Sequence, residues 1–198
     1  MSQAADAPPP DPVGFALGWL VLLGLLVVLL VVVWQAGGHW VALTQADAAL
    51  NTTTGRRVLF WLLIGLGLLV SGYLAYVETT QIQAVCGPVG ECNVVQSSPY
   101  AQIMGIPIAV FGLLFYLALA GLWLAQRFEN ASRLVAPALV ALTLFGVLFS
   151  LYLTLLELLV IGAICAWCLA SAVVTGLLSV LVTRWAVKRP LPSSNLPE

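Results

Sequence analysis

Four cysteines in two pairs are the residues of this sequence whose type and spacing can do chemistry. Cys86 and Cys92 lie in a loop with five residues between them, and Cys165 and Cys168 form a C-x-x-C motif. Thiols at such short spacings can form small disulfides and exchange with other thiols. Structural disulfides and a four-cysteine zinc site are the other uses of such a set. We favour redox exchange and expect no metal, because zinc would pin the two pairs together permanently and the only histidine, His39, lies elsewhere.

The C-x-x-C motif carries the stronger redox signal, because it lies at the expected start of a helix. Unpaired N–H groups and the helix dipole favour a thiolate at that position, so we expect a lowered thiol pKa. Gly87 and Gly90 lie between the loop cysteines and either give that link the backbone freedom to move or serve as ordinary turn residues.

The composition indicates whether the chain folds in water or in a membrane. Of the 198 residues, 62% are hydrophobic and 8% are charged, against about 25% charged in soluble domains. This excludes a water-soluble globule and a disordered chain, and seven basic residues argue against nucleic-acid binding. Unbroken apolar runs such as residues 20–34 do not alternate as barrel strands do. The sequence therefore predicts an all-α integral membrane protein in a lipid bilayer.

Five apolar runs are long enough to span a bilayer, at about 20 residues each. The expected spans are residues 15–34, 58–77, 105–125, 134–156 and 164–183. We divide the chain into four parts. They are a disordered lead (1–14), an extra transmembrane helix with its cytoplasmic connection (15–57), a four-helix core (58–183) with an outer loop at 78–104, and a cytoplasmic tail (184–198).

The basic residues predict the orientation, because positively charged loops stay in the cytoplasm. With five spans, all of them fall on one side of the membrane: Arg56, Arg57, Arg127, Arg133, Arg184, Lys188 and Arg189. The N-terminus is then outside, the C-terminus is cytoplasmic, and both cysteine pairs lie at the outer face of the cell (inner) membrane.

These residues resemble the vitamin K epoxide reductase family in its bacterial branch. The resemblance is carried by Cys86, then Cys92-Asn-Val-Val-Gln-Ser-Ser-Pro-Tyr-Ala, then Gly105-Ile-Pro with Gly112, and Cys165-Ala-Trp-Cys168. It covers about residues 58–183. It implies a four-helix bundle around a quinone, with the first span as an extra helix to which we assign no function.

The resemblance also implies an electron path that drives disulfide formation in exported proteins. A thioredoxin-like partner on the outer face gives electrons to the loop pair, which passes them to the C-x-x-C and so to the membrane quinone pool. Cys86 would exchange with the partner, Cys92 would relay to Cys165, and Cys168 would face the quinone. Ser98 matches a serine near the quinone in the family, and a simple turn residue is the alternative of equal weight.

Other details of the resemblance concern the ligand and the partner. The quinone is of menaquinone, ubiquinone or vitamin K type. Trp167 can stack on its ring or serve as an interfacial belt residue. The chain has Ala172 where animal relatives often carry tyrosine, which weakens the case for vitamin K epoxide as a substrate. The chain ends soon after the fifth span, so we expect no fused thioredoxin-like domain and a separate partner protein.

Several polar and small residues in the spans remain open to two interpretations. Glu157 is expected to be an interfacial carboxylate in water, with proton donation to the quinone as the alternative. Ser150 and Thr154 can line a pocket or join helices. The glycines of the second span suggest close helix contacts, namely Gly65, Gly67 and Gly72.

Two other functions compete with this interpretation. A second type of membrane disulfide-forming enzyme places its C-x-x-C before the other pair, which is the reverse of the order here. A small transporter or channel subunit with structural disulfides is the alternative outside enzymes. The spans hold almost no charge and no pair of broken helices of the kind that forms substrate sites, which disfavours a transporter.

Overall fold

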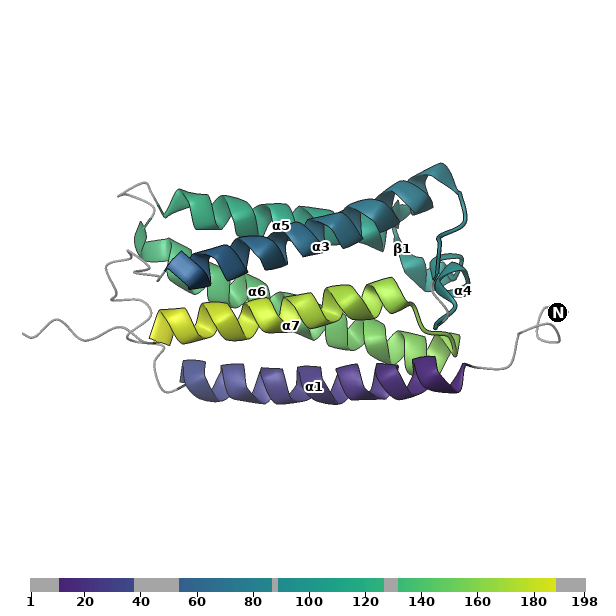
Figure 1. Ribbon diagram of the computed structural model, residues 1–198, viewed down its shortest axis with the longest axis horizontal. Coiled ribbons are helices and arrows are strands. Elements are labelled where there is room, and N and C mark those ends of the chain that lie inside the picture. The colour runs from purple at the N-terminus through teal and green to yellow at the C-terminus, as the bar shows by residue number, and fades with distance from the viewer. Residues whose placement is uncertain (1–10, 38–53, 87–88, 127–131, 188–198) are drawn as a thin grey trace, which may run out of the picture.

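The computed structural model describes residues 11–37, 54–86, 89–126 and 132–187, and long helices dominate it (Figure 1). They are α1 (Pro12–Gly37), α3 (Thr54–Thr80), α5 (Ile108–Ala125), α6 (Ser132–Leu156) and α7 (Ala166–Val187). Each contains a segment long and apolar enough to cross a bilayer. The chain is therefore a multi-pass, all-helical membrane protein, and the five expected spans are confirmed.

The helix ends differ from the expected ones where local geometry intervenes. Helix α1 begins at Pro12, within the expected lead, because Asp11 caps it with a hydrogen bond from the Val13 N–H to Oδ1 at 3.0 Å. The third span begins later than expected, since the strands β1 (Gln102–Ile103) and β2 (Ile106–Pro107) pair as a short hairpin before α5. Residues 1–10 of the lead, most of the first connection, and residues 188–198 of the tail lie outside the described residues.

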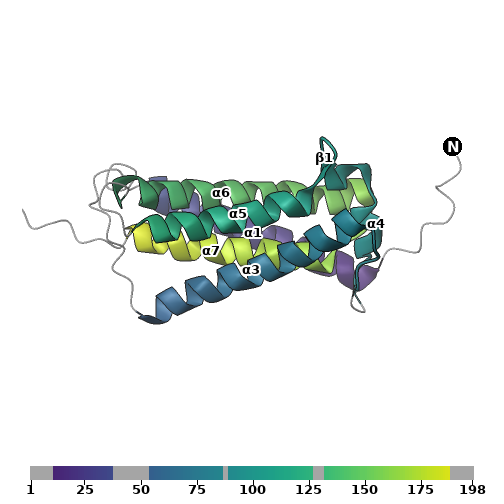
Figure 2. The same cartoon turned by 90° about the horizontal axis from the view of Figure 1, so that it is seen from above.

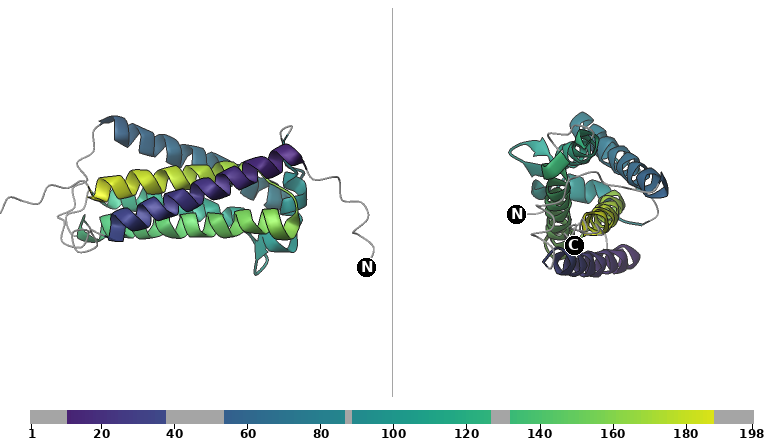
Figure 3. Two further views of the ribbon diagram at one scale, coloured as in Figure 1. Left: turned by 90° about the horizontal axis from the view of Figure 1, so that it is seen from below. Right: turned by 90° about the vertical axis from the view of Figure 1, so that its left-hand side faces the viewer.

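Four of the helices form a closed ring. Helix α3 packs on α5, α5 on α6, α6 on α7, and α7 on α3, while α1 lies outside this ring against α6 and α7. Figure 2 shows α3 crossing the bundle obliquely, and the end-on view in Figure 3 shows α1 beside α6 and α7. The ring of four is the expected core, and α1 is the expected extra helix.

An aromatic cluster joins three helices at one end of the ring. The Phe60 and Trp123 rings stack with centroids 4.1 Å apart, and Trp123 and Trp185 lie 5.0 Å apart. Such pairs contribute about 0.5–1.5 kcal/mol beyond the burial of their area. The described basic side chains lie at this same end, at the start of α3 (Arg56, Arg57) and in the last turn of α7 (Arg184).

A layer of short elements covers the other end of the ring. It consists of α4 (Cys92–Gln96), the 3₁₀ turn η1 (Pro99–Ala101), the β1–β2 hairpin and the π-helical turn η2 (Glu157–Ile161) that extends α6. Figure 1 shows α4 and the cysteine loop gathered at this end, close to the start of α1. Cys92 begins α4 and Cys168 lies in the first turn of α7, while Cys86 and Cys165 lie in the loop segments before these two helices.

Candidate active site

The structure brings the four cysteines into one row of contacting thiols. Cys92 makes side-chain hydrogen bonds with both Cys86 and Cys165, and Cys165 makes one with Cys168. All four are free thiols. The pairs expected from the sequence therefore meet, in the order Cys86, Cys92, Cys165, Cys168.

The two ends of this row have different surroundings from its middle. Cys92 and Cys165 are fully buried, at 0% exposure. Cys86 is half-buried in the loop, and Cys168 lines a cavity inside the bundle. A thiol exchange can therefore enter at Cys86 and leave at Cys168 without exposing the two central sulfurs.

Three side chains from different helices hold the extended segment that leads to Cys86. The side-chain oxygen of Asn93 accepts a hydrogen bond from the Ala84 N–H at 2.8 Å, and its amide group donates to the Ala84 carbonyl at 3.3 Å. The hydroxyl of Tyr73 accepts from the Val85 N–H at 2.7 Å. Trp167 donates its indole N–H to the Val85 carbonyl at 3.0 Å.

These contacts bear on the first of the two uses considered for Trp167, stacking on the quinone ring. The Trp167 ring lies 5.2 Å from that of Tyr73 and does not line the cavity. The indole N–H is hydrogen-bonded to the loop carbonyl of Val85, because Trp167 lies in the first turn of α7, next to this segment. The structure therefore places Trp167 as a support for the Cys86 segment.

The sulfur atom of Cys165, the first residue of the C-x-x-C motif, caps the start of α7. Gly162 takes the left-handed conformation (φ 72°) that ends η2 and turns the chain back toward Cys165. The Cys168 N–H donates to Cys165 Sγ at 3.3 Å, in the manner of a helix N-cap. The expected lowered thiol pKa is wrong for Cys165, however: the Cys168 thiol, burial and the Glu157 carboxylate raise its pKa well above the ordinary value.

The pKa values of the two loop thiols are also raised. Burial and the Cys92 thiol raise the pKa of Cys86 to about 11. The Cys165 thiol and burial raise the pKa of Cys92. In the reduced protein these three thiols are therefore neutral, and their reaction requires a group that accepts a proton.

Glu157 is placed to be that group, and its expected position in water is wrong. It is 4% exposed, because the π-helical turn η2 directs it inward beneath the C-x-x-C motif. Its Oε2 accepts a hydrogen bond from the Cys165 N–H at 3.0 Å, and its side chain also hydrogen-bonds the Cys168 thiol. A carboxylate in direct contact with a thiol can exchange a proton with it.

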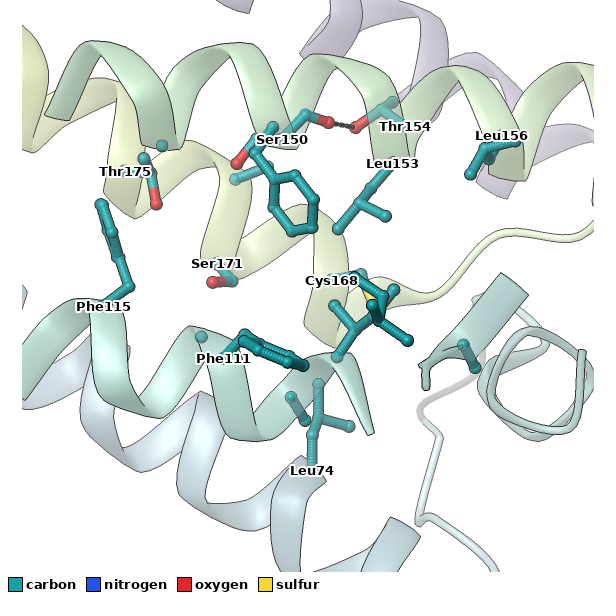
Figure 4. Close-up of a pocket in the computed structure, with 18 of the residues that line it drawn as sticks. Leu74, Phe111, Phe115, Ser150, Leu153, Thr154, Leu156, Cys168, Ser171 and Thr175 are labelled. Carbon is teal, nitrogen blue, oxygen red and sulfur yellow. Dashed lines mark hydrogen bonds between the residues drawn. The ribbon is translucent and has the colours of Figure 1, made fainter. Parts of the chain in front are cut away.

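A cavity of about 490 Å³ lies inside the ring beside Cys168. Its walls come from all four ring helices and from the layer above them, and most of its lining is apolar (Figure 4). The figure shows Phe111 and Leu153 close to Cys168, with Ser171 and Thr175 one and two turns farther along α7. Ser150 and Thr154 line this cavity as well, which fits the first of their two interpretations.

Polar groups line the cavity at two levels. Near the cysteines, Ser98 Oγ and Glu78 Oε2 are buried without a hydrogen-bond partner. Farther along, the Tyr116 hydroxyl lies 3.0 Å from the Ser171 hydroxyl and 3.1 Å from that of Thr175. The unpartnered atoms of Ser98 and Glu78 are available to a ligand that enters the cavity.

Sequence reasoning did not assign roles to Asn93 or to the aromatic walls of the cavity, and it considered Tyr73 only as a pocket-lining residue or a contact between helices. Asn93 directly follows Cys92, and this adjacency was the one available signal. Within the part of the chain that the structure describes, no three histidine, cysteine, aspartate or glutamate side chains are arranged to hold a metal ion.

Comparison with known protein families identifies the bundle that carries this site. The sequence model of the vitamin K epoxide reductase family matches residues 58–183. The match begins in the first turns of α3 and ends near the end of α7, so it covers the ring of four helices and all four cysteines but not α1. Because the match spans more than half of the chain, the protein belongs to the vitamin K epoxide reductase family.

Proposed function

We propose that the protein takes electrons from a thioredoxin-like partner and passes them through its two cysteine pairs to a membrane quinone. Membership of the family makes it a membrane oxidoreductase in general. The observation that carries the finer proposal is the row of four thiols, which runs from half-buried Cys86 to Cys168 at the cavity.

The proposed cycle begins with the loop pair as a disulfide. A partner thiolate attacks Cys86, and Cys92 leaves as a thiolate; the second partner thiol then releases the oxidised partner. Cys92 next attacks Cys165 of the C-x-x-C disulfide, and Cys168 leaves. Attack of Cys86 on Cys92 releases Cys165, which restores the loop disulfide and leaves a reduced C-x-x-C.

The final step transfers two electrons and two protons from this dithiol to the quinone, giving a quinol and the Cys165–Cys168 disulfide. The residues around the cavity fit such a substrate. Its apolar walls suit a ring of menaquinone, ubiquinone or vitamin K type, and Ser98 Oγ is an unpartnered polar atom for a quinone carbonyl. Glu157 contacts the Cys168 thiol and would accept its proton in this step.

The orientation follows from the charges at the opposite end of the bundle. Arg56, Arg57 and Arg184 lie at the end away from the cysteines, which the positive-inside rule assigns to the cytoplasm. The N-terminus and the cysteines would then lie at the outer face of the cell membrane. The oxidised partner formed there would introduce disulfides into exported proteins.

Quinone absorbance in lipid nanodiscs tests this function, with a reduced thioredoxin-like protein as donor. We expect steady turnover in the intact chain and none in Cys168→Ala or Cys92→Ser. Cys86→Ala should lose turnover from the protein donor. Normal turnover in Cys168→Ala would contradict the relay. A transporter with structural disulfides would give no quinone turnover and would keep its function when all four thiols are removed.

A further inference from the structure

Helix α1 lies outside the residues that match the family, yet Asp11, the residue immediately before it, contacts the cysteine loop. Asp11 uses Oδ1 to cap α1 at Val13, and its Oδ2 accepts a hydrogen bond from the Gly90 N–H at 3.0 Å. Gly90 lies between Cys86 and Cys92 in the chain. One carboxylate therefore joins the start of α1 to the link between the loop cysteines.

The same link also lies directly on the segment that precedes the C-x-x-C motif. The Glu91 N–H donates to the Ile164 carbonyl at 2.7 Å. Gly90 has a φ of 94°, and a Cβ at this position would lie 2.7 Å from that carbonyl oxygen. The backbone of the loop is thus in close contact with residue 164, immediately before Cys165.

Helix α1 supports this segment from its other side. Gly18 lets the helix approach so closely that a Cβ there would lie 3.0 Å from side-chain carbons of both Leu158 and Ile164. Leu22 and Leu25 pack in one buried cluster with these residues and with Leu169 of α7. The start of α1 therefore contacts both partners of the exchange, the loop through Asp11 and the C-x-x-C segment through Ile164.

We propose that Asp11 is a positioning residue for electron transfer between the two cysteine pairs, because its bond to Gly90 keeps Cys92 docked on Cys165. The inference rests on the proposed function, and it gives α1 a role in it. Attack of Cys92 on Cys165 requires the two sulfurs to stay in contact, as they do in this loop position. Asp11 favours this position without touching any sulfur atom.

The disulfide between Cys92 and Cys165 measures this docking directly. In the full chain with Cys86→Ala and Cys168→Ala, only these two thiols remain, and glutathione disulfide oxidises them to one bond with release of two glutathione thiols. The equilibrium constant against glutathione reports how closely the loop is held. Asp11→Ser is the test variant, since serine keeps an N-cap oxygen for α1 but has no second oxygen for Gly90.

We expect Asp11→Ser to lower the Cys92–Cys165 equilibrium constant by about three- to tenfold, the effect of losing one charge-assisted hydrogen bond near the surface. The control is the same substitution in a Cys86→Ala, Cys92→Ala background, where the Cys165–Cys168 constant should not change. An unchanged Cys92–Cys165 constant would overturn the role of Asp11, and so would an equal fall in the control pair. Failure of the bond to form even with Asp11 present would instead contradict the proposed relay itself.

Discussion

Glu157 Oε2 accepts a hydrogen bond from the backbone N–H of Cys165 at 3.0 Å, and the same carboxyl group contacts the Cys168 thiol. One side chain thus fixes the start of the C-x-x-C motif and touches its second sulfur. The π-helical turn makes this possible, because its extra residue changes the direction of the chain after α6.

Glu157→Gln should separate these two roles. Glutamine keeps an oxygen that can accept from the Cys165 N–H, but it cannot take a proton from Cys168. We expect the rate of quinone reduction to fall by about 100-fold or more, the usual loss on removing a general base, with little change in thermal stability. Stopped-flow absorbance of the quinone measures the rate. Glu91→Gln is the matched control, and a normal rate in Glu157→Gln would exclude proton transfer through this carboxylate.

Ser98→Ala should weaken quinone binding. Its Oγ is buried at the cavity without a partner, and a hydrogen bond of about 0.5–1.5 kcal/mol to the substrate corresponds to a two- to tenfold rise in KM. Ser97→Ala is the control, because Ser97 is exposed and its hydroxyl donates to the Val94 carbonyl at 3.2 Å. Equal KM values for the two variants would favour the alternative of a simple turn residue at Ser98.

Gly67→Ala should disturb the cavity wall, since a Cβ at Gly67 would overlap the ring of Tyr116. Overpacking of this kind costs about 1–3 kcal/mol, so we expect a lower Tm and slower quinone turnover. Gly65→Ala is the control in the same helix, because nothing lies within 4 Å of that position. Thermal unfolding in detergent compares the two variants, and identical melting curves would show that Tyr116 can move aside.

Alkylation of the reduced protein should depend steeply on pH at Cys86. Burial and the neighbouring Cys92 thiol raise the pKa of Cys86 to about 11. Because only the thiolate reacts, the rate should rise about tenfold per pH unit from neutral pH until the pH approaches that value. Mass spectrometry of iodoacetamide-treated protein gives the rate at Cys86, with buried Cys92 and Cys165 as internal controls. A rate that levels off near pH 8 would mean that Cys86 is an ordinary exposed thiol.

The five helices and the meeting of the cysteine pairs followed from long apolar runs and from charges confined to one side. Those signals are strong because a bilayer admits few alternatives. The positions of Glu157 and Trp167 did not follow. One additional residue in a helical turn decides whether Glu157 points to water or to the C-x-x-C, and no residue pattern marks that turn. Trp167 was assigned by residue type, whereas the loop carbonyl of Val85 determines where its indole N–H points.

Contact between helices was also only partly predictable. Gly67 makes the expected close approach, while Gly65, two positions earlier, faces open space. Glycine content indicates that a close contact exists in α3, but the direction of each glycine depends on how α3 crosses α5. The role of α1 could not be read at all, because Asp11 and Gly90 are separated by 79 positions in the sequence.

A single anaerobic turnover tests most directly whether the C-x-x-C pair reduces the quinone. The fully reduced Cys86→Ala, Cys92→Ala protein is mixed in nanodiscs with one equivalent of menaquinone or ubiquinone. We expect one quinone to become quinol for each Cys165–Cys168 disulfide that mass spectrometry detects. We expect no reaction in a protein that also carries the Cys168→Ala substitution. A quinone that stays oxidised, with both thiols still free, would contradict electron transfer from this motif.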